Sequence, residues 1–208
     1  MNNTDLLVPA WLDPLAEHGY AIVDQWLPVD LFDQLRAFFQ RRQQEDDFDK
    51  AGIGAQKDHQ IRSRIRGDYV YWLDPVRDGE AAPLFPALEE VQAQLNRYCF
   101  LSLSGYEFHL AWYPPGAGYK KHLDQFQGRN NRMISLIVYL NHHWREGDGG
   151  ELKLYLPDGE LLAPPLPNRM VIFKSGEVYH EVLPTRVGRF SLTGWLLHQP
   201  AGLGYLLG

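Results

Sequence analysis

The stretch RFSLTGWLL, residues 189–197, alternates between two kinds of side chain, which is the period of a β-strand. One set is apolar and consists of Phe190, Leu192 and Leu196. The other set carries a guanidinium, two hydroxyls and an indole, on Arg189, Ser191, Thr193 and Trp195. Successive side chains of a strand point to opposite faces, so the apolar face can pack against helices. If the polar face looks into a barrel, the buried guanidinium needs an anion, which this strand lacks and a ligand carboxylate would supply.

Other short stretches after about residue 105 share this period of two, and Gly, Pro, Asn or Asp separate them. They are residues 106–113, 132–141, 151–156 and 169–174. In residues 132–141 the alternation places on one face Met133, Ser135, Ile137 and Tyr139. In residues 106–113 it places on one face His109, Ala111 and Tyr113. A phenol beside the guanidinium would be a second donor for a carboxylate.

The region before residue 100 has helical periodicity instead. Residues 30–45 carry an apolar stripe, and Asp30 is the expected N-cap of that helix. Residues 83–99 repeat the pattern on a second amphipathic helix. A shorter first helix is expected to end at His18, with Gly19 as its stop.

This order of elements predicts an α+β fold, because helices that precede many short strands typically brace one side of a β-sandwich or jelly roll. The expected brace spans about residues 8–100 and the expected jelly-roll core about residues 105–198, within a single domain of residues 1–208. No apolar run approaches the length of a membrane span, and the N-terminus lacks the pattern of a signal peptide. The single cysteine, Cys99, forms no internal disulfide, so we expect a cytoplasmic protein.

The net charge of −6 argues against binding to a nucleic acid, which needs clustered lysine and arginine. Basic residues do gather in two short stretches, at Arg62, Arg64 and Arg66 and at Lys120, Lys121, Arg129 and Arg132. Such residues are either solvated surface groups or a docking face for an acidic segment of a partner protein.

The segment GYKKHLDQFQ, residues 118–127, brings a histidine and an aspartate within two positions of each other. The preceding WYPPGAG breaks any helix, so His122 and Asp124 are expected to lie on an extended segment and to project to the same side. Among the other histidines, His180 follows a strand and SGEVY, where a side chain can point into a barrel mouth. The remaining histidines have no local feature that indicates a ligand: His18, His59, His109, His142, His143 and His198.

Two histidines and one aspartate match the ligand set of non-heme Fe(II) oxygenases, which leaves positions open for a chelating co-substrate and O2. A catalytic zinc site with two histidines and a carboxylate is the alternative. Zinc hydrolysis has no evident use for a carboxylate anchor made of an arginine and a tyrosine, so this pattern favours iron.

Long segments of the chain resemble the Fe(II)- and 2-oxoglutarate-dependent prolyl hydroxylase domain family. Between Tyr113 and Trp195 these segments are YPPGAGYKKHLDQF, VYLN, DGGELKLYLPDG, VIFKSGEVYHEVLP and TRVGRFSLTGW. IRGDYVYWLD, which starts at Ile65, and HGYAIVDQWL also resemble the family, and SGEVYHEV is similar to its shorter bacterial members. The resemblance implies a double-stranded β-helix, which agrees with the jelly roll expected from the strands.

The resemblance also implies roles for individual residues. It implies iron ligation by His122, Asp124 and His180. It implies a grip on the distal carboxylate of 2-oxoglutarate by Arg189 and Tyr139, rather than by Arg186. It implies that the same cavity is lined by Tyr113, Thr193 and Trp195, and that substrate is bound by Arg66, Asp68 and Tyr119. The implied cofactors are Fe(II), 2-oxoglutarate and O2, with ascorbate as reductant.

The implied reaction is hydroxylation of a prolyl residue in a protein, and elongation factor Tu is the leading substrate among those of bacterial relatives. The polar loop of residues 51–60 is expected to close over the substrate peptide. A hydroxylase of a small molecule and a catalytically silent jelly roll that binds a ligand or partner are the alternatives. The apolar tail AGLGYLLG, residues 201–208, is expected to pack on the body or on a second subunit, and the oligomeric state stays open.

Overall fold

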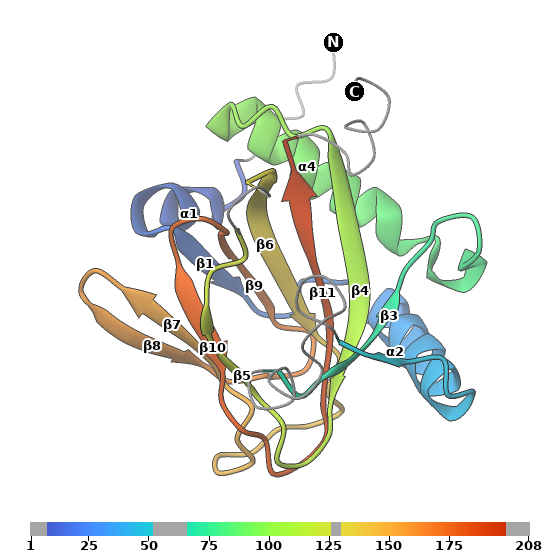
Figure 1. Ribbon diagram of the computed structural model, residues 1–208. Helices are drawn as coiled ribbons and strands as arrows, with labels where there is room; N and C mark the ends of the chain where they lie inside the picture. The colour runs from blue at the N-terminus through green and yellow to red at the C-terminus, as the bar shows by residue number, and fades with distance from the viewer. Residues whose placement is uncertain (1–7, 52–65, 126–129, 199–208) are drawn as a thin grey trace, which may run out of the picture.

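The computed structural model describes residues 8–51, 66–125 and 130–198 (Figure 1). Several sequence-based expectations lie outside these described residues. They concern the closing loop after Ala51, the basic residues Arg62, Arg64 and Arg129, His59, and the apolar tail.

Two antiparallel sheets face each other and form the body of the protein (Figure 1). The larger sheet has the strand order β1 (Tyr20–Val23), β9 (Met170–Lys174), β6 (Arg132–Tyr139), β11 (Arg189–Leu197), β4 (Gly105–Tyr113), β3 (Tyr69–Trp72) and β2 (Asp49–Lys50). The smaller sheet has the order β5 (Tyr119–His122), β10 (Tyr179–Val182), β7 (Leu152–Leu156) and β8 (Gly159–Ala163). The predicted α+β double-stranded β-helix is confirmed.

The helices cover the outer side of the larger sheet (Figure 1). They are α1 (Leu12–His18), α2 (Val29–Gln44) and α4 (Leu84–Cys99), with a short 3-10 turn η1 (Gly79–Ala81). As expected, α1 ends at Gly19, whose φ of 80° lies in the left-handed region and whose N–H bonds to Leu15 O. The N-cap expected at Asp30 is wrong: Pro28 occupies that position, and Asp30 lies in the first turn of α2, where a carboxylate complements the helix dipole.

The larger sheet separates two apolar cores. The two faces of β11 point toward different cores. Leu192 and Leu196 lie on the helix side, together with buried side chains of α1, α2 and α4. Between the two sheets lies the second core, which includes Tyr113, Tyr139 and Phe173. The alternation in the sequence therefore predicts correctly which face of β11 packs against the helices.

The expected helical brace also contains strands, which is a difference from the sequence interpretation. β1 and β3 pair with β9 and β4, and β2 pairs with β3, so the first hundred residues extend the larger sheet at both edges. Each of these strands has only two to four residues. That length shows almost no periodicity, so pairing with distant strands decides their structure.

Candidate active site

His122 and His180 come from neighbouring strands of the smaller sheet and lie opposite each other in the pairing of β5 with β10. His122 Nδ1 lies 2.7 Å from Lys120 O, and His180 Nδ1 lies 3.2 Å from Val178 O. A carbonyl oxygen can only accept, so both Nδ1 atoms carry the hydrogen and both Nε2 atoms present a lone pair. This is the tautomer that a metal-binding imidazole needs. His180 lies within β10 rather than at the strand exit that the sequence suggested.

Asp124 lies in a bend two residues after the end of β5, and its side chain turns toward both imidazoles. The expected extended conformation is therefore seen up to His122 and gives way to a bend at the aspartate. Asp124 Oδ2 accepts a hydrogen bond of 2.6 Å from Ser135 Oγ, and Ser175 Oγ lies 2.8 Å from Ser135 Oγ. Since the Ser135 hydrogen is given to the carboxylate, Ser175 is the donor in the second bond. This chain of hydroxyls fixes the rotamer of a carboxylate that is only 7% exposed.

The candidate ligand atoms of His122, Asp124 and His180 all lie within 4.8 Å of one another. Asp124 Oδ1 is 3.5 Å from His122 Nε2, and Asp124 Oδ2 is 3.6 Å from His180 Nε2. Burial lowers the pKa of His180 to about 4, although the aspartate opposes this shift, so the imidazole is neutral at pH 7. Burial raises the pKa of Asp124, but the neighbouring imidazoles and Ser135 outweigh it and hold the pKa below its usual value. An ionised carboxylate, the neutral imidazole of His180 and a second histidine beside them fit a divalent transition metal.

Arg189 lies between the two sheets, and its guanidinium carbon is 4.9 Å from the Tyr113 ring centre and 5.0 Å from the Tyr139 ring centre. Its Nε donates to Gly150 O at 2.9 Å, and its Nη1 donates to Ser191 Oγ at 3.3 Å. A Cβ atom on Gly150 would lie 3.2 Å from Arg189 Cδ, so this glycine allows the close approach.

Two polar atoms at this place have no hydrogen-bond partner among the described residues. One is Nη2 of Arg189 itself, and the other is the hydroxyl of the neighbouring Tyr139. Burial raises the pKa of the Tyr139 phenol, and the positive charge of the Arg189 guanidinium opposes that shift. The two groups do not form a hydrogen bond of normal geometry. Two buried, unpartnered donors that converge in one place fit the carboxylate predicted from the sequence.

Arg66, Asp68 and Tyr119 form one connected unit at the edge of the same cavity. Arg66 Nε and Nη2 donate to the two carboxylate oxygens of Asp68 at 2.6 and 2.8 Å. The guanidinium carbon lies 4.9 Å from the Tyr119 ring centre, and the Tyr119 ring stacks on His122 at 3.6 Å between centroids. Asp68 is fully buried, so its carboxylate positions Arg66.

The remaining wall of the cavity comes from β4 and β11, where Thr193 pairs with His109 and Trp195 lies two residues further on. Thr193 Oγ1 lies 3.0 Å from Ser191 Oγ. The Trp195 ring is covered by Arg132, which also donates to Glu107 Oε1 at 2.7 Å. Arg132 is thus paired and stacked, which differs from its expected place in a free basic docking face. Lys120 and Lys121 remain exposed at the edge of β5.

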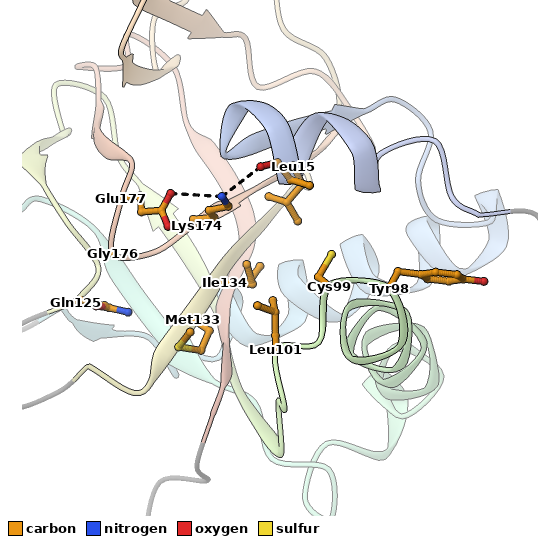
Figure 2. A pocket seen from close by; sticks show the side chains of 11 residues that line it. Leu15, Tyr98, Cys99, Leu101, Gln125, Met133, Ile134, Lys174, Gly176 and Glu177 are labelled. Atoms are coloured by element: carbon orange, nitrogen blue, oxygen red, sulfur yellow. Dashed lines mark hydrogen bonds and ion pairs between the residues drawn. The ribbon is translucent and has the colours of Figure 1, made fainter.

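A larger hollow of about 490 Å³ lies elsewhere, next to α1 and the end of α4 (Figure 2). Its wall is mostly apolar, with Lys174 at one side bonded to Glu177 and to Ala16 O. The candidate metal ligands do not line it. Size alone therefore does not identify the functional site, because the converging titratable groups lie in the smaller cavity.

Sequence reasoning did not identify the serines that hold the aspartate or the unpartnered imidazole of His109. Ser135 shares the inner face with Tyr139, so its place was visible in the period of β6, but its partner was not. Ser175 follows β9 and carries no sequence signal for its role.

A double-stranded β-helix with a group of two histidines and one aspartate that could hold a metal ion is typical of metal-dependent jelly-roll proteins. The family model of the 2OG-Fe(II) oxygenase superfamily matches residues 108–197. Among solved structures, a Pseudomonas putida prolyl-4-hydroxylase is 39% identical, with a TM-score of 0.84 over 91% of this chain and 98% of that chain. A Trichoplax adhaerens prolyl hydroxylase, in complex with a hypoxia inducible factor peptide fragment, is 25% identical, with a TM-score of 0.81 over 89% and 86% of the two chains.

The chain therefore belongs to the 2OG-Fe(II) oxygenase superfamily and is of the prolyl hydroxylase type. It is an Fe(II)- and 2-oxoglutarate-dependent dioxygenase. Within the part of the chain that the structure describes, none of the helices has the length and apolar character to cross a membrane.

Proposed function

We propose that this dioxygenase hydroxylates a prolyl residue of a protein substrate, with Fe(II) held by His122, Asp124 and His180. The observation that carries the proposal is that Arg189, whose Nη2 has no partner among the described residues, lines the same cavity as this metal-binding group. The unpartnered hydroxyl of Tyr139 belongs to a ring whose centre lies 5.0 Å from the Arg189 guanidinium carbon. A dicarboxylic co-substrate that chelates the metal at one end needs a cationic anchor at the other end. The described residues offer such an anchor beside the metal-binding group.

When bound, Fe(II) and 2-oxoglutarate supply the oxidising chemistry, in which O2 is activated at the cost of decarboxylating the co-substrate. The protein groups then have positioning roles. Ser135 holds the Asp124 carboxylate in place, and the Nδ1 hydrogen bonds of the two histidines direct their Nε2 lone pairs inward. Arg189 would bind the far carboxylate of 2-oxoglutarate in the cavity that Tyr113, Thr193 and Trp195 also line. Tyr139, whose ring lies beside the guanidinium, would help to bind the same carboxylate.

The protein substrate would enter where Arg66 and Tyr119 meet the cavity, with Asp68 holding the guanidinium in place. The exposed Lys120 and Lys121 on the neighbouring strand edge support contact with an acidic segment. We propose elongation factor Tu as the substrate and ascorbate as the reductant that keeps the iron in its Fe(II) state. The likeness to the Pseudomonas putida prolyl-4-hydroxylase over nearly its whole length supports hydroxylation of a proline, and the complex of the Trichoplax enzyme with a peptide supports a peptide substrate in general.

The test is to mix the protein with Fe(II), ascorbate, 2-oxoglutarate and bacterial elongation factor Tu in air, and to measure succinate and the intact mass of the factor. Succinate together with one added oxygen on a proline is the expected result. Succinate without added oxygen would overturn elongation factor Tu as the substrate. Absence of succinate with every protein or peptide offered would overturn the assignment of the site. Omission of ascorbate should shorten the linear phase of turnover.

A further inference from the structure

His109 lies on β4 and is buried to within 1% of complete coverage, although an imidazole has two polar atoms. Among the described residues, neither Nδ1 nor Nε2 has a hydrogen-bond partner. Its ring lies against two indoles, 4.7 Å from Trp72 and 5.5 Å from Trp195 between ring centres. The same cavity wall contains a third unpartnered polar atom, Nε1 of Trp195.

Ordinary core packing does not account for this imidazole, because buried polar atoms in folded proteins are almost always hydrogen-bonded. An apolar side chain of similar volume would fill the space without the desolvation cost. His109 lines the cavity that contains the metal-binding group, so its ring borders the space in which a molecule would be bound. The unpartnered nitrogens therefore indicate a ligand contact.

The charge state limits what that ligand can be. Burial holds the pKa of His109 well below its usual value, and the positive charges of Arg66 and Arg132 lower it further. A neutral imidazole has one N–H donor and one acceptor nitrogen, and the indole Nε1–H adds a second donor. This wall consequently suits a neutral acceptor, such as an amide carbonyl.

We propose that His109 is a specificity-determining residue, whose ring N–H, together with Trp195 Nε1–H, donates to a backbone carbonyl of the substrate next to the target proline. The proposal rests on the proposed prolyl hydroxylation. Proline has no backbone N–H, so at the target residue itself the main chain offers a carbonyl acceptor and no donor. A wall with two donors therefore recognises the backbone of a prolyl peptide, while the proline ring itself is apolar.

Trp72, which neighbours His109, connects this wall of the cavity with the protein surface. Trp72 is 47% exposed, whereas Trp195 is only 5% exposed, and their ring centres lie 6.3 Å apart. His109 contacts both rings, so the three side chains lead from the surface into the cavity. In this proposal an extended peptide would follow these rings inward from Trp72 and meet the imidazole beside Trp195.

The experiment begins with a panel of proline-containing peptides, from which one that the wild-type enzyme hydroxylates is chosen by succinate release and added mass. The variant His109→Met removes both nitrogens at similar volume, and His109→Gln restores a donor and an acceptor. Loss of one hydrogen bond is expected to raise the KM for the peptide about 3- to 10-fold in His109→Met, with the KM for 2-oxoglutarate unchanged. His109→Gln should recover most of that loss.

The matched control is Gln92→Met on α4, because Gln92 Oε1 is also buried without a partner but does not line the cavity. Both methionine variants should leave the melting temperature unchanged or raise it, since each removes an unpartnered polar atom. Only His109→Met should change the KM for the peptide. The ratio of hydroxylated peptide to succinate should also fall in His109→Met, since a loosely held proline allows uncoupled turnover.

Thioamide peptides give a second test that a folding defect cannot imitate. Sulfur in place of the carbonyl oxygen, before or after the proline, makes a weaker acceptor and should raise the KM for wild type at one of the two positions. The same replacement should have little effect on His109→Met, which has already lost the donor. If the thioamide raised the KM equally in wild type and in His109→Met, or if His109→Met had an unchanged KM for the peptide, this inference alone would be overturned. Absence of any hydroxylated peptide with wild type would overturn the proposed function, and this inference with it.

Discussion

Two regions of one cavity differ in how their polar groups are satisfied. In the metal-binding group, the Nδ1 atoms of His122 and His180 bond to backbone carbonyls, and Ser135 holds the Asp124 carboxylate. Elsewhere in this cavity and next to it, four side chains carry buried polar atoms without partners among the described residues. They are Arg189, Tyr139, His109 and Trp195.

Under the proposed function, this difference separates the side chains that the protein orients in advance from those whose donors it leaves for a ligand. A metal ligand has to be held in one rotamer before the ion arrives, so its other polar atom is tied to the protein. A group that binds a co-substrate or substrate is useful only if its donor is free. Each free buried donor costs about 1 to 3 kcal/mol of stability until a ligand accepts its hydrogen bond. The predictions below test this contrast, from the largest expected effect to the smallest.

Asp124→Ala should abolish turnover, because two imidazoles without the carboxylate hold a divalent metal weakly. We expect succinate formation below about one thousandth of the wild-type rate, with a matching loss of bound Fe(II) measured by metal analysis. His143→Ala is the control, because His143 is exposed and lies outside the cavity. Wild-type turnover in Asp124→Ala, or in His180→Ala, would contradict the assignment of the metal ligands.

Arg189→Ala should raise the KM for 2-oxoglutarate by about 100-fold, because charged hydrogen bonds to the far carboxylate are lost. Binding of the metal alone should change by less than about threefold, since Arg189 does not touch the metal-binding group. Titration of turnover with 2-oxoglutarate and separate titration with metal distinguish the two effects. Arg186→Ala, which removes an exposed arginine three residues away, should behave as wild type. An equal effect of both variants would rule out a specific anchor.

Ser135→Ala should weaken metal binding by about 10-fold, because the Asp124 carboxylate loses the donor that fixes its rotamer. Ser175→Ala should have a smaller effect of the same sign, since Ser175 reaches the carboxylate only through Ser135. Metal titrations of the two variants measure this order directly. At saturating metal, the KM for 2-oxoglutarate should stay at the wild-type value. The reverse order would show that the hydroxyl chain does not position the ligand.

Tyr139→Phe should raise the KM for 2-oxoglutarate by about 3- to 10-fold, because one donor to the carboxylate is lost. Without 2-oxoglutarate the same variant should be more stable, with a free energy of unfolding about 1 kcal/mol higher, since an unpartnered hydroxyl is removed. Denaturant unfolding of wild type and variant measures the sign of this change in the free energy of unfolding. Tyr155→Phe is the matched control, because its hydroxyl donates to Glu181 Oε1 at 2.6 Å. It should be slightly less stable, with unchanged kinetics. Stabilisation of both variants, or of neither, would contradict the contrast.

The sequence predicted the jelly roll well where strands are long enough to show alternation. β4, β6 and β11 each have eight or nine residues, and their inner and outer faces follow from the order of side chains over most of their length. Met133 is an exception, because it packs with the helix-side core at the end of β6 where the pairing with β11 is irregular. The short strands β1, β2 and β3 were missed, because a strand of two to four residues is defined by its pairing partner. Asp30 was wrongly expected as an N-cap, because Pro28 starts the helix two residues earlier.

For the site, the extended segment ending at His122 was predictable, because the breakers before it exclude a helix. The two-residue spacing alone does not bring Asp124 to the histidines; a bend after β5 and the Ser135 hydroxyl do so. The histidine ligand set needs the pairing of β5 with β10, which joins distant parts of the sequence. The types of the candidate ligand residues were thus visible in the sequence, whereas the distances between their side chains were not.

By itself the sequence determined the class of fold, the candidate ligand residues and the need of Arg189 for an anion, because periodicity and residue chemistry are local properties. Only the tertiary structure decided which of these polar groups have hydrogen-bond partners and which have none among the described residues. The physical reason is that a hydrogen-bond partner of a buried group usually comes from a distant segment, as Ser135 does for Asp124, and that burial itself arises from packing. His109 carried no signal in the sequence, since only its complete burial among groups that offer no bond makes it informative.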